Sequence, residues 1–183
     1  MLCDKTNSQL LIIDVQQRLC AAMPEQALAQ LLRNTTILIT AAKALQIPLL
    51  VTEQYPQGLG STHEQIKTTL PSEQIFYNKT CFSSCGAKDI KPALTAAAHA
   101  QFILTGMETH VCVLQTALEL KQRGATVFVV EDAVCSRFKP QFNNAIARLR
   151  NAGIIITNTE SVLFEWLRDA SHPQFKALSQ LIR

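Results

Sequence analysis

The segment 105–113 contains the residue whose position best suits chemistry, Cys112. An apolar run ends at Thr105, the chain turns at Gly106, and we expect a helix with Thr109 as its N-cap residue, which puts Cys112 in the first helical turn. Backbone N–H groups in a first turn lack an acceptor within the helix, and the positive end of the helix dipole favours a thiolate. This position suits a cysteine nucleophile beside an oxyanion site. The alternative is a buried structural cysteine, because free cysteine is among the most buried residue types.

Two charged residues also follow apolar stretches of the chain. Asp14 ends the run that starts at Leu10, and Lys79 follows a shorter run that ends near Tyr77. A carboxylate buried at the end of an apolar strand costs free energy of desolvation unless a cation or a hydrogen-bond donor accompanies it. The alternative for Asp14 is a turn-capping carboxylate, and the alternative for Lys79 is a solvated side chain.

The elements that must position these residues alternate between two types. Short apolar, β-branched runs predict strands that are buried on both faces. They lie at Leu10 to Val15, Pro48 to Thr52, Ile75 to Tyr77, Phe102 to Thr105, Thr126 to Val130 and Ile154 to Thr157. Stretches with helical spacing separate most of them. The alternation predicts a mostly parallel sheet with helices on both faces, and ligands of such sheets bind outside the carboxyl ends of the strands.

Helix punctuation agrees with this assignment. Gly124 and Gly153 follow two of the predicted helices, and Ser61 with Glu64 is expected to form a capping box after the second strand. Because no linker, repeat or change in composition divides the chain, we expect one domain over residues 1–183.

Composition limits the classes of function. The 183 residues are 48% hydrophobic and 17% charged, and the net charge is +3 without a basic run. Nucleic-acid binding is therefore not expected. Apolar stretches fall short of the roughly 20 residues that span a bilayer, and the N-terminus lacks the pattern of a signal peptide. We expect a cytoplasmic protein without a membrane anchor, whose six cysteines are reduced.

Three motifs, taken together, resemble a known family. They are LIIDVQ at 11–16, NKTCFS at 78–83 and GMETHVCV at 106–113. Their order and spacing are similar to the Asp/Lys/Cys triad of the isochorismatase-like cysteine hydrolases. The segments TEQYP at 52–56 and DASHPQF at 169–175 resemble the isochorismatase-domain-containing subgroup. The resemblance covers nearly the whole chain and implies a three-layer α/β/α sandwich around a six-stranded sheet.

The resemblance also implies a mechanism. Cys112 is expected to attack an electrophilic carbon of a small-molecule substrate, Asp14 to accept the thiol proton, and Lys79 to stabilise the thiolate and keep the aspartate ionised. A cis peptide between Met107 and Glu108 is expected to aim the N–H groups of Glu108 and Cys112 at an oxyanion. Relatives commonly form dimers or larger rings, so a homo-oligomer is expected.

One departure from the family concerns metal binding. Nicotinamidase relatives bind a metal through an Asp-x-His motif after the second strand, where this chain has Gln54, Tyr55 and Pro56. His63 follows this loop without suitable partners, so we expect no metal. No dinucleotide fingerprint or phosphate-binding loop occurs, and no cofactor is expected.

Several nearby residues are candidates for the substrate pocket because they lie close in sequence to the triad or to strand ends. They are Gln16, Gln54, Tyr55, Phe82 and Glu108. We expect His110 to be structural, because residues two apart on a helix point away from one another. His99 and His172 lack a partner motif and are expected to be surface or packing residues.

Two other functions remain open from the sequence. The first is a non-catalytic interaction protein that keeps the fold and the triad by descent. The second is a thiol redox protein that uses Cys81, Cys85 or Cys112, although the spacing of Cys81 and Cys85 is not that of a Cys-x-x-Cys motif.

Overall fold

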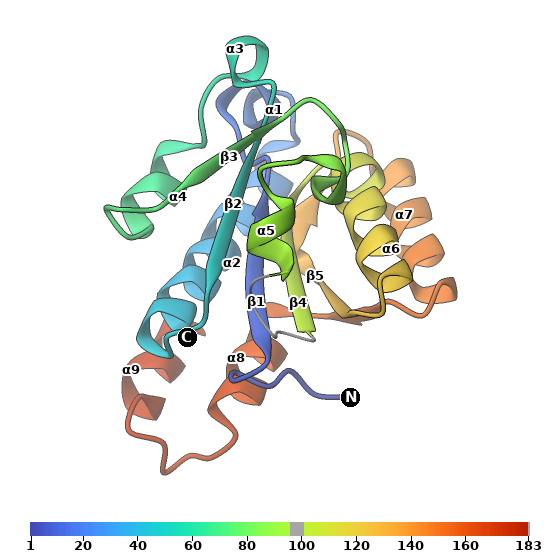
Figure 1. Cartoon of the computed structure of the whole chain (residues 1–183). Coiled ribbons are helices and arrows are strands. Elements are labelled where there is room, and N and C mark those ends of the chain that lie inside the picture. Colours follow the sequence, from blue (N-terminus) through green and yellow to red (C-terminus); the bar gives the residue numbers. More distant parts are fainter. Residues whose placement is uncertain (96–100, 183) are drawn as a thin grey trace.

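A computed structural model describes residues 1–95 and 101–182, so that His99 lies outside the described residues. Its centre is a six-stranded sheet with the strand order β3-β2-β1-β4-β5-β6 (Figure 1). The strands are β1 (Ser8–Ile13), β2 (Leu49–Gln54), β3 (Phe76–Lys79), β4 (Gln101–Met107), β5 (Thr126–Cys135) and β6 (Ile155–Thr157). Every pairing is parallel, which confirms the predicted six-stranded α/β class and makes the expected mostly parallel sheet all-parallel.

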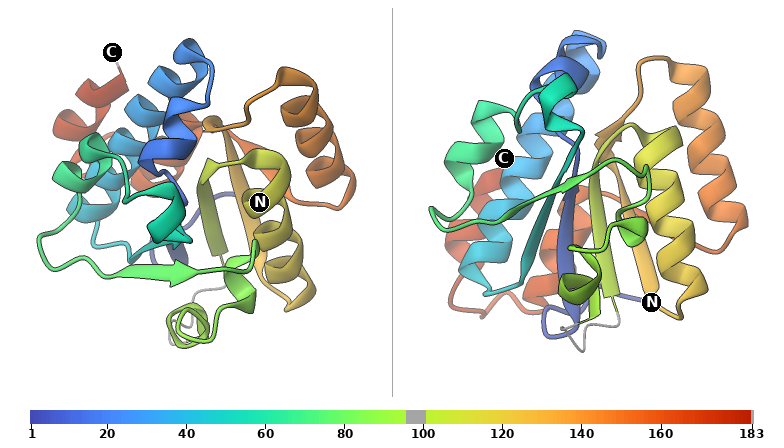
Figure 2. Two further views of the ribbon diagram at one scale, coloured as in Figure 1. Left: turned by 90° about the horizontal axis from the view of Figure 1, so that it is seen from above. Right: turned by 45° about the horizontal axis from the view of Figure 1, so that its top comes forward.

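Helices connect the strands. They are α1 (Gln17–Ala21), α2 (Glu25–Ala44), α3 (Pro56–Leu59), α4 (Glu64–Thr69), α5 (Lys91–Thr95), α6 (Leu114–Gln122), α7 (Lys139–Asn151), α8 (Thr159–Leu167) and α9 (Phe175–Ser179). The layer with α2 and α8 covers one face of the sheet, and the layer with α6 and α7 covers the other (Figure 2). Among the helices of the described residues, none is long and apolar enough to cross a membrane.

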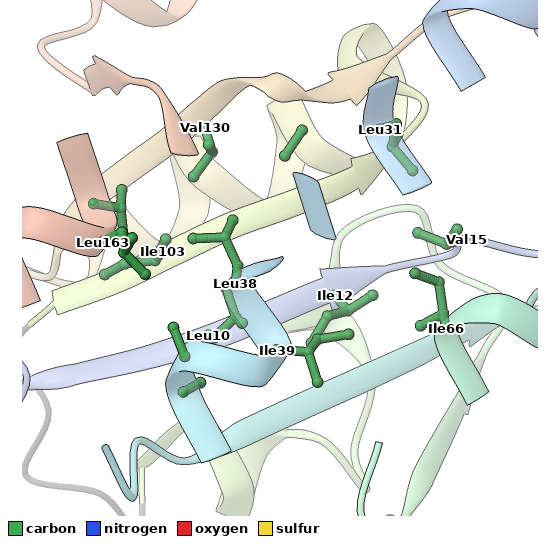
Figure 3. Close-up of a cluster of buried hydrophobic side chains, with 14 of the residues drawn as sticks. Leu10, Ile12, Val15, Leu31, Leu38, Ile39, Ile66, Ile103, Val130 and Leu163 are labelled. Atoms are coloured by element: carbon green, nitrogen blue, oxygen red, sulfur yellow. The ribbon is translucent and has the colours of Figure 1, made fainter. Parts of the chain in front are cut away.

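The central strand β1 shows why the sheet is covered on both sides. Leu10 and Ile12 pack into the cluster under α2 and α8 (Figure 3), whereas Leu11 and Ile13 pack into the cluster under α6 and α7. All four side chains are fully buried. Successive residues of a strand point to opposite faces, so a strand covered on both faces must be continuously apolar.

The strand order creates a switch point between β1 and β4. From β1 the chain moves outward to β2 and β3, and then returns to place β4 on the other side of β1. Loops that leave these two strands at their carboxyl ends diverge and leave room for a site. Asp14 follows β1 directly, and the segment with Cys112 follows β4.

Gly106 permits the close approach of β4 to β1 at this point. It pairs with Ile13 in the ladder and has a φ of +118°. A Cβ atom at this position would lie 2.0 Å from the Ile13 carbonyl oxygen, so only glycine fits without a shift of the backbone.

Two predicted helix starts are wrong. Thr109 is not an N-cap: it is already the first residue of a π-helical turn, Thr109–Val113, whose N-cap is Glu108. The turn is wide because the Glu108 carbonyl accepts a hydrogen bond from the Val113 N–H, five residues further along the chain. The capping box of Ser61 is also absent, since His63 caps α4 by accepting a hydrogen bond from the Gln65 N–H.

Candidate active site

The carboxyl ends of β1 and β3 bring Asp14 and Lys79 into contact. The Lys79 Nζ lies 2.6 Å from the Asp14 Oδ2, and neither side chain has any exposed surface. The two residues are 65 positions apart and their strands are separated by β2. The turn-cap alternative for Asp14 and the solvated alternative for Lys79 therefore do not describe these side chains.

Asp14 is held by the neighbouring strand β2. The Thr52 hydroxyl donates a 2.7 Å hydrogen bond to the Asp14 Oδ1, and the Asp14 N–H donates to the Thr52 carbonyl at 3.1 Å. Asp14 has a φ of +52°, in the left-handed region that aspartate tolerates better than most residues. This turn at the end of β1 aims the carboxylate at Lys79.

The Lys79 ammonium has four acceptors in the structure. Beside Asp14, its Nζ donates to the Gln54 Oε1 at 2.8 Å, to the Phe82 carbonyl at 3.0 Å and to the Cys81 carbonyl at 3.3 Å. An ammonium has three N–H donors, so its capacity is fully used. These contacts hold the loop after β3 against the carboxylate and keep the lysine side chain in one orientation.

Cys112 lies in the π-helical turn after β4 and is 5% exposed. Burial raises the pKa of its thiol to about 12, with a further increase from the Asp14 carboxylate, while Lys79 acts in the opposite direction. Both charged groups therefore lie close enough to act on the sulfur. The position at a helix start favours a thiolate, but the net pKa of Cys112 is raised, because burial and the nearby carboxylate outweigh the lysine.

The Glu108 carboxylate is engaged with Arg137 and lies near His110. Its oxygens accept hydrogen bonds from the Arg137 N–H and Nε at 3.1 and 3.2 Å, and the His110 Nδ1 lies 3.8 Å away. His110 Nδ1 also contacts the Ser136 hydroxyl at 3.0 Å, so the ring is engaged with the loop after β5. The peptide bond between Met107 and Glu108 is cis.

Apart from Glu108, the predicted pocket residues fall into two pairs. The amides of Gln16 and Gln54 are buried and bonded within the protein: Gln16 bridges to the Gln54 backbone, and Gln54 bonds to Lys79 and to the Thr80 carbonyl. Tyr55 and Phe82, by contrast, are 54% and 53% exposed. Only this second pair therefore offers free surface to a ligand.

A cleft of about 420 Å³ reaches Lys79 from the side of Tyr55 and Cys81. Cys81 is partly exposed there, and its side chain lies beside Gly86. A larger cleft of about 650 Å³ lies at the carboxyl end of β5, with Ala27, Val134 and Phe142 in its wall, and it includes no residue of the Asp/Lys/Cys set.

The positions that bind metal in nicotinamidase relatives hold other groups here. Gln54 is engaged with Lys79 and Thr80, and Pro56 is the first residue of α3. Among the described residues, no group of three or more histidine, cysteine and acidic side chains is arranged to hold a metal ion.

Sequence reasoning missed Thr52 and Arg137. Thr52 stands opposite Ile13 in the β1–β2 ladder, so its place beside Asp14 depends on the register of two strands that are about 40 residues apart. Arg137 follows β5 and reaches Glu108 only because β5 pairs with β4. Thr52 opens the segment at 52–56, but that motif gave no sign of a contact with Asp14, and Arg137 lies outside all of the motifs.

The fold and these residues identify the class of protein. The chain belongs to the isochorismatase domain family, since the model of the isochorismatase domain matches residues 8–161. The parallel six-stranded sheet between two helical layers is the isochorismatase-like fold, as the resemblance of the three motifs predicted.

Individual relatives support this assignment. The chain is 35% identical to the isochorismatase domain-containing protein 2 of Bos taurus, over 97% of this chain and 83% of the relative. It is 37% identical to the secreted isochorismatase effector Isc1 of Phytophthora sojae, over 97% and 85%. Similarity to these proteins confirms the subgroup suggested by the motifs at 52–56 and 169–175.

Solved structures are similar over the full chain. A Caenorhabditis elegans structure described as the MAR1 ribonuclease has a TM-score of 0.93 and 36% identity, and it covers all of this chain and 92% of that one. The Escherichia coli YcaC structure, described as an octameric hydrolase of unknown specificity, has a TM-score of 0.91 and 24% identity, over 100% and 89%. This second likeness concerns the fold alone.

Proposed function

We propose that this protein is a metal-independent cysteine hydrolase of a small molecule with an amide, ester or related bond. Cys112 is the nucleophile, Asp14 the base and Lys79 the electrostatic partner. The observation that carries the proposal is the buried contact between Lys79 and Asp14, because both of these charges act on the pKa of the Cys112 thiol. A thiol with a perturbed pKa beside a buried ion pair, at the switch point of a parallel sheet, is typical of an active site.

The first chemical step follows from the protonation state of the thiol. Since the pKa of Cys112 is about 12, the resting sulfur is protonated. As the sulfur attacks the substrate carbon, its proton passes to Asp14 and the carbonyl electrons move to oxygen. Asp14 then no longer holds a negative charge against Lys79, so the ammonium becomes available to the new anion. The net charge of Asp14, Lys79, Cys112 and the substrate stays the same.

The remaining steps reverse this transfer. The carbon–leaving-group bond breaks, the departing nitrogen or oxygen takes the proton from Asp14, and a thioester to Cys112 remains. Water then attacks the thioester with Asp14 as base, and the acid and the free thiol are released. We place the oxyanion near the N–H groups of Glu108 and Cys112.

Four further proposals concern the protein as a whole. The protein acts as one domain over 1–183, it is cytoplasmic, it uses no cofactor, and it forms a homo-oligomer. The octameric state in the description of YcaC supports the last of these. Tyr55 and Phe82 are proposed substrate contacts because their side chains are exposed beside Lys79, whereas Gln16 and Gln54 act within the protein.

The experiment is a hydrolysis screen with the wild type beside Cys112→Ala and Asp14→Asn. Small amides, esters and vinyl ethers form the main panel, and a short RNA is added because the C. elegans relative is described as a ribonuclease. We expect turnover of at least one small substrate, and loss of at least about a hundredfold in each variant. Cys135→Ala is the matched control, since Cys135 is another buried cysteine whose pKa is about 12.

The other outcomes either exclude the mechanism or favour a different function. Near wild-type turnover by Cys112→Ala would exclude the mechanism. Absence of turnover together with a stable oligomer would favour a non-catalytic interaction protein, and reversible thiol oxidation without hydrolysis would favour a redox protein.

A further inference from the structure

We propose that Gln54 is a positioning residue, whose neutral amide aims the Lys79 ammonium at Asp14 and Cys112. The inference rests on the proposed function, in which Lys79 must serve both groups. It also means that Gln54 acts through the lysine and does not touch the substrate.

The orientation of the Gln54 amide is fixed from both ends. Its Oε1 accepts from the Lys79 Nζ at 2.8 Å, and its Nε2 donates to the Thr80 carbonyl at 2.7 Å. A flipped amide would place its NH₂ against the ammonium and its oxygen against a carbonyl, so only one orientation satisfies both neighbours. The residue is 9% exposed, and each of its amide atoms already has a protein partner.

A second glutamine holds the backbone of Gln54. The Gln16 Oε1 accepts from the Gln54 N–H at 2.7 Å, and the Gln16 Nε2 donates to the Gln54 carbonyl at 3.0 Å and to the Gly60 carbonyl at 2.7 Å. Gln16 has no exposed surface. The pair links the ends of β1 and β2, so the acceptor offered to Lys79 is held in place from both strands.

The neutrality of the amide matters for the lysine. Among the four acceptors of the Lys79 Nζ, Asp14 alone is an anion, and the others are the Gln54 amide and the carbonyls of Cys81 and Phe82. A neutral acceptor directs an N–H without opposing the charge. A carboxylate in the same place would set a second anion against the ammonium and weaken its effect on the sulfur of Cys112.

The experiment compares two replacements of nearly equal size. Gln54→Glu keeps the shape and one oxygen acceptor but adds a negative charge, while Gln54→Met removes the acceptor without adding charge. Gln65→Glu, on the exposed surface of α4, is the control for an added charge. With any substrate found in the screen, we expect kcat to fall at least tenfold in both Gln54 variants and KM to stay within threefold. The control should match the wild type.

Alkylation of Cys112 by iodoacetamide gives a readout that needs no substrate. Labelling is located by peptide mass spectrometry between pH 7 and 10. We expect the alkaline rise in rate to move to higher pH in Gln54→Glu and to move less in Gln54→Met, because only the former opposes the charge of Lys79. A merely structural defect would instead expose the thiol and accelerate labelling in both variants.

A thermal double-mutant comparison tests the contact itself. The loss of Tm caused by Gln54→Met should shrink by at least half when Lys79 is already methionine, since the partner is then absent. Equal losses in the two backgrounds would overturn the inference, as would a raised KM with unchanged kcat, which marks a substrate contact. If the wild type hydrolyses nothing, the proposed function fails, but the alkylation and Tm measurements still decide the role of Gln54.

Discussion

Lys79 and Asp14 form an ion pair that is closed off from solvent: the 2.6 Å contact joins two side chains with no exposed surface. Burial of two charges costs free energy of desolvation, which their attraction offsets only when geometry and hydrogen bonding are good. Here Thr52 completes the partners of the carboxylate, and Gln54 with two backbone carbonyls completes those of the ammonium. Removing either charge alone leaves the other buried without its counter-charge.

This pairing predicts strong thermodynamic coupling. Lys79→Met should lower the free energy of unfolding by about 3 to 5 kcal/mol, because it leaves an uncompensated carboxylate. The double variant with Asp14→Asn should lose at least about 1 kcal/mol less than the sum of the two single losses. Urea unfolding of the wild type, the two single variants and the double variant measures these free energies.

An exposed ion pair provides the control cycle. Glu131 and Arg150 lie 2.8 Å apart, but their side chains are 38% and 55% exposed. Their coupling should stay below about 1 kcal/mol. Equal coupling in the two cycles would mean that burial does not strengthen the Lys79–Asp14 contact.

Asp14→Asn should lower turnover and also lower the pKa of the Cys112 thiol. The base is lost, so turnover falls, but removal of the negative charge lowers the pKa of the thiol, because Asp14 raises it in the wild type. We expect wild-type alkylation by iodoacetamide to depend weakly on pH between about 6 and 8, where Asp14 takes the proton directly. The variant should show up to a tenfold rise per pH unit and overtake the wild type at alkaline pH.

Peptide mapping by mass spectrometry measures the rate of Cys112 alkylation against pH in the wild type and in Asp14→Asn. Parallel profiles for wild type and variant would contradict the role of Asp14 as the base. Unchanged protection of the buried Cys135 shows that the variant is still folded.

Gly106→Ala should destabilise the protein far more than Gly124→Ala. Both glycines have a positive φ, +118° and +87°, but only at Gly106 would a Cβ meet backbone, at 2.0 Å from the Ile13 oxygen. We expect a loss of at least about 3 kcal/mol for Gly106→Ala and of about 1 to 2 kcal/mol for Gly124→Ala. Urea unfolding tests the difference. A similar loss for both variants would show that the end of β1 adapts to the added atom.

Stability should fall with rising pH through the buried thiols. Burial raises the pKa of Cys20 to about 11 and the pKa values of Cys112 and Cys135 to about 12. The unfolded chain releases these thiol protons near pH 8.5 to 9, whereas the folded chain keeps them. Unfolding therefore becomes easier above about pH 9. The stability that the protonated thiols contribute is lost as the pH rises toward their pKa values in the folded state. Each thiol contributes at most about 1.4 kcal/mol per pH unit.

Denaturant unfolding of wild type and Cys112→Ala between pH 7 and 10.5 measures this contribution. The variant should lose less stability over the alkaline range, and Cys135→Ala should behave similarly. Identical slopes for all three proteins would mean that these thiols ionise as readily in the folded state as in the unfolded state.

Much of the architecture was predictable because it depends on local patterns. Six apolar runs predict strands that are buried on both faces, and each of them is a strand of the sheet. The prediction of burial on both faces is wrong for β3 and β6, which are only partly buried because they lie at the edges of the sheet. The prediction stops β5 at Val130, whereas β5 runs on to Cys135, since the polar pair Glu131 and Asp132 interrupts the apolar pattern without ending the strand. The start of the helix after β4 was also mispredicted, because a π-helical turn has no distinct sequence signal.

By itself, the sequence determined the family and the parallel α/β class. It also predicted Asp14, Lys79 and Cys112 as the residues for chemistry, since each stands in a short motif that follows an apolar run. Only the tertiary structure decided how they relate. The register of β1, β2 and β3 brings Thr52 beside Asp14 and Gln54 beside Lys79. Burial at the end of the sheet raises the pKa of the Cys112 thiol, whereas a position at a helix start favours a lower pKa. Burial and contacts between strands depend on parts of the chain far apart in sequence, so no local pattern carries them.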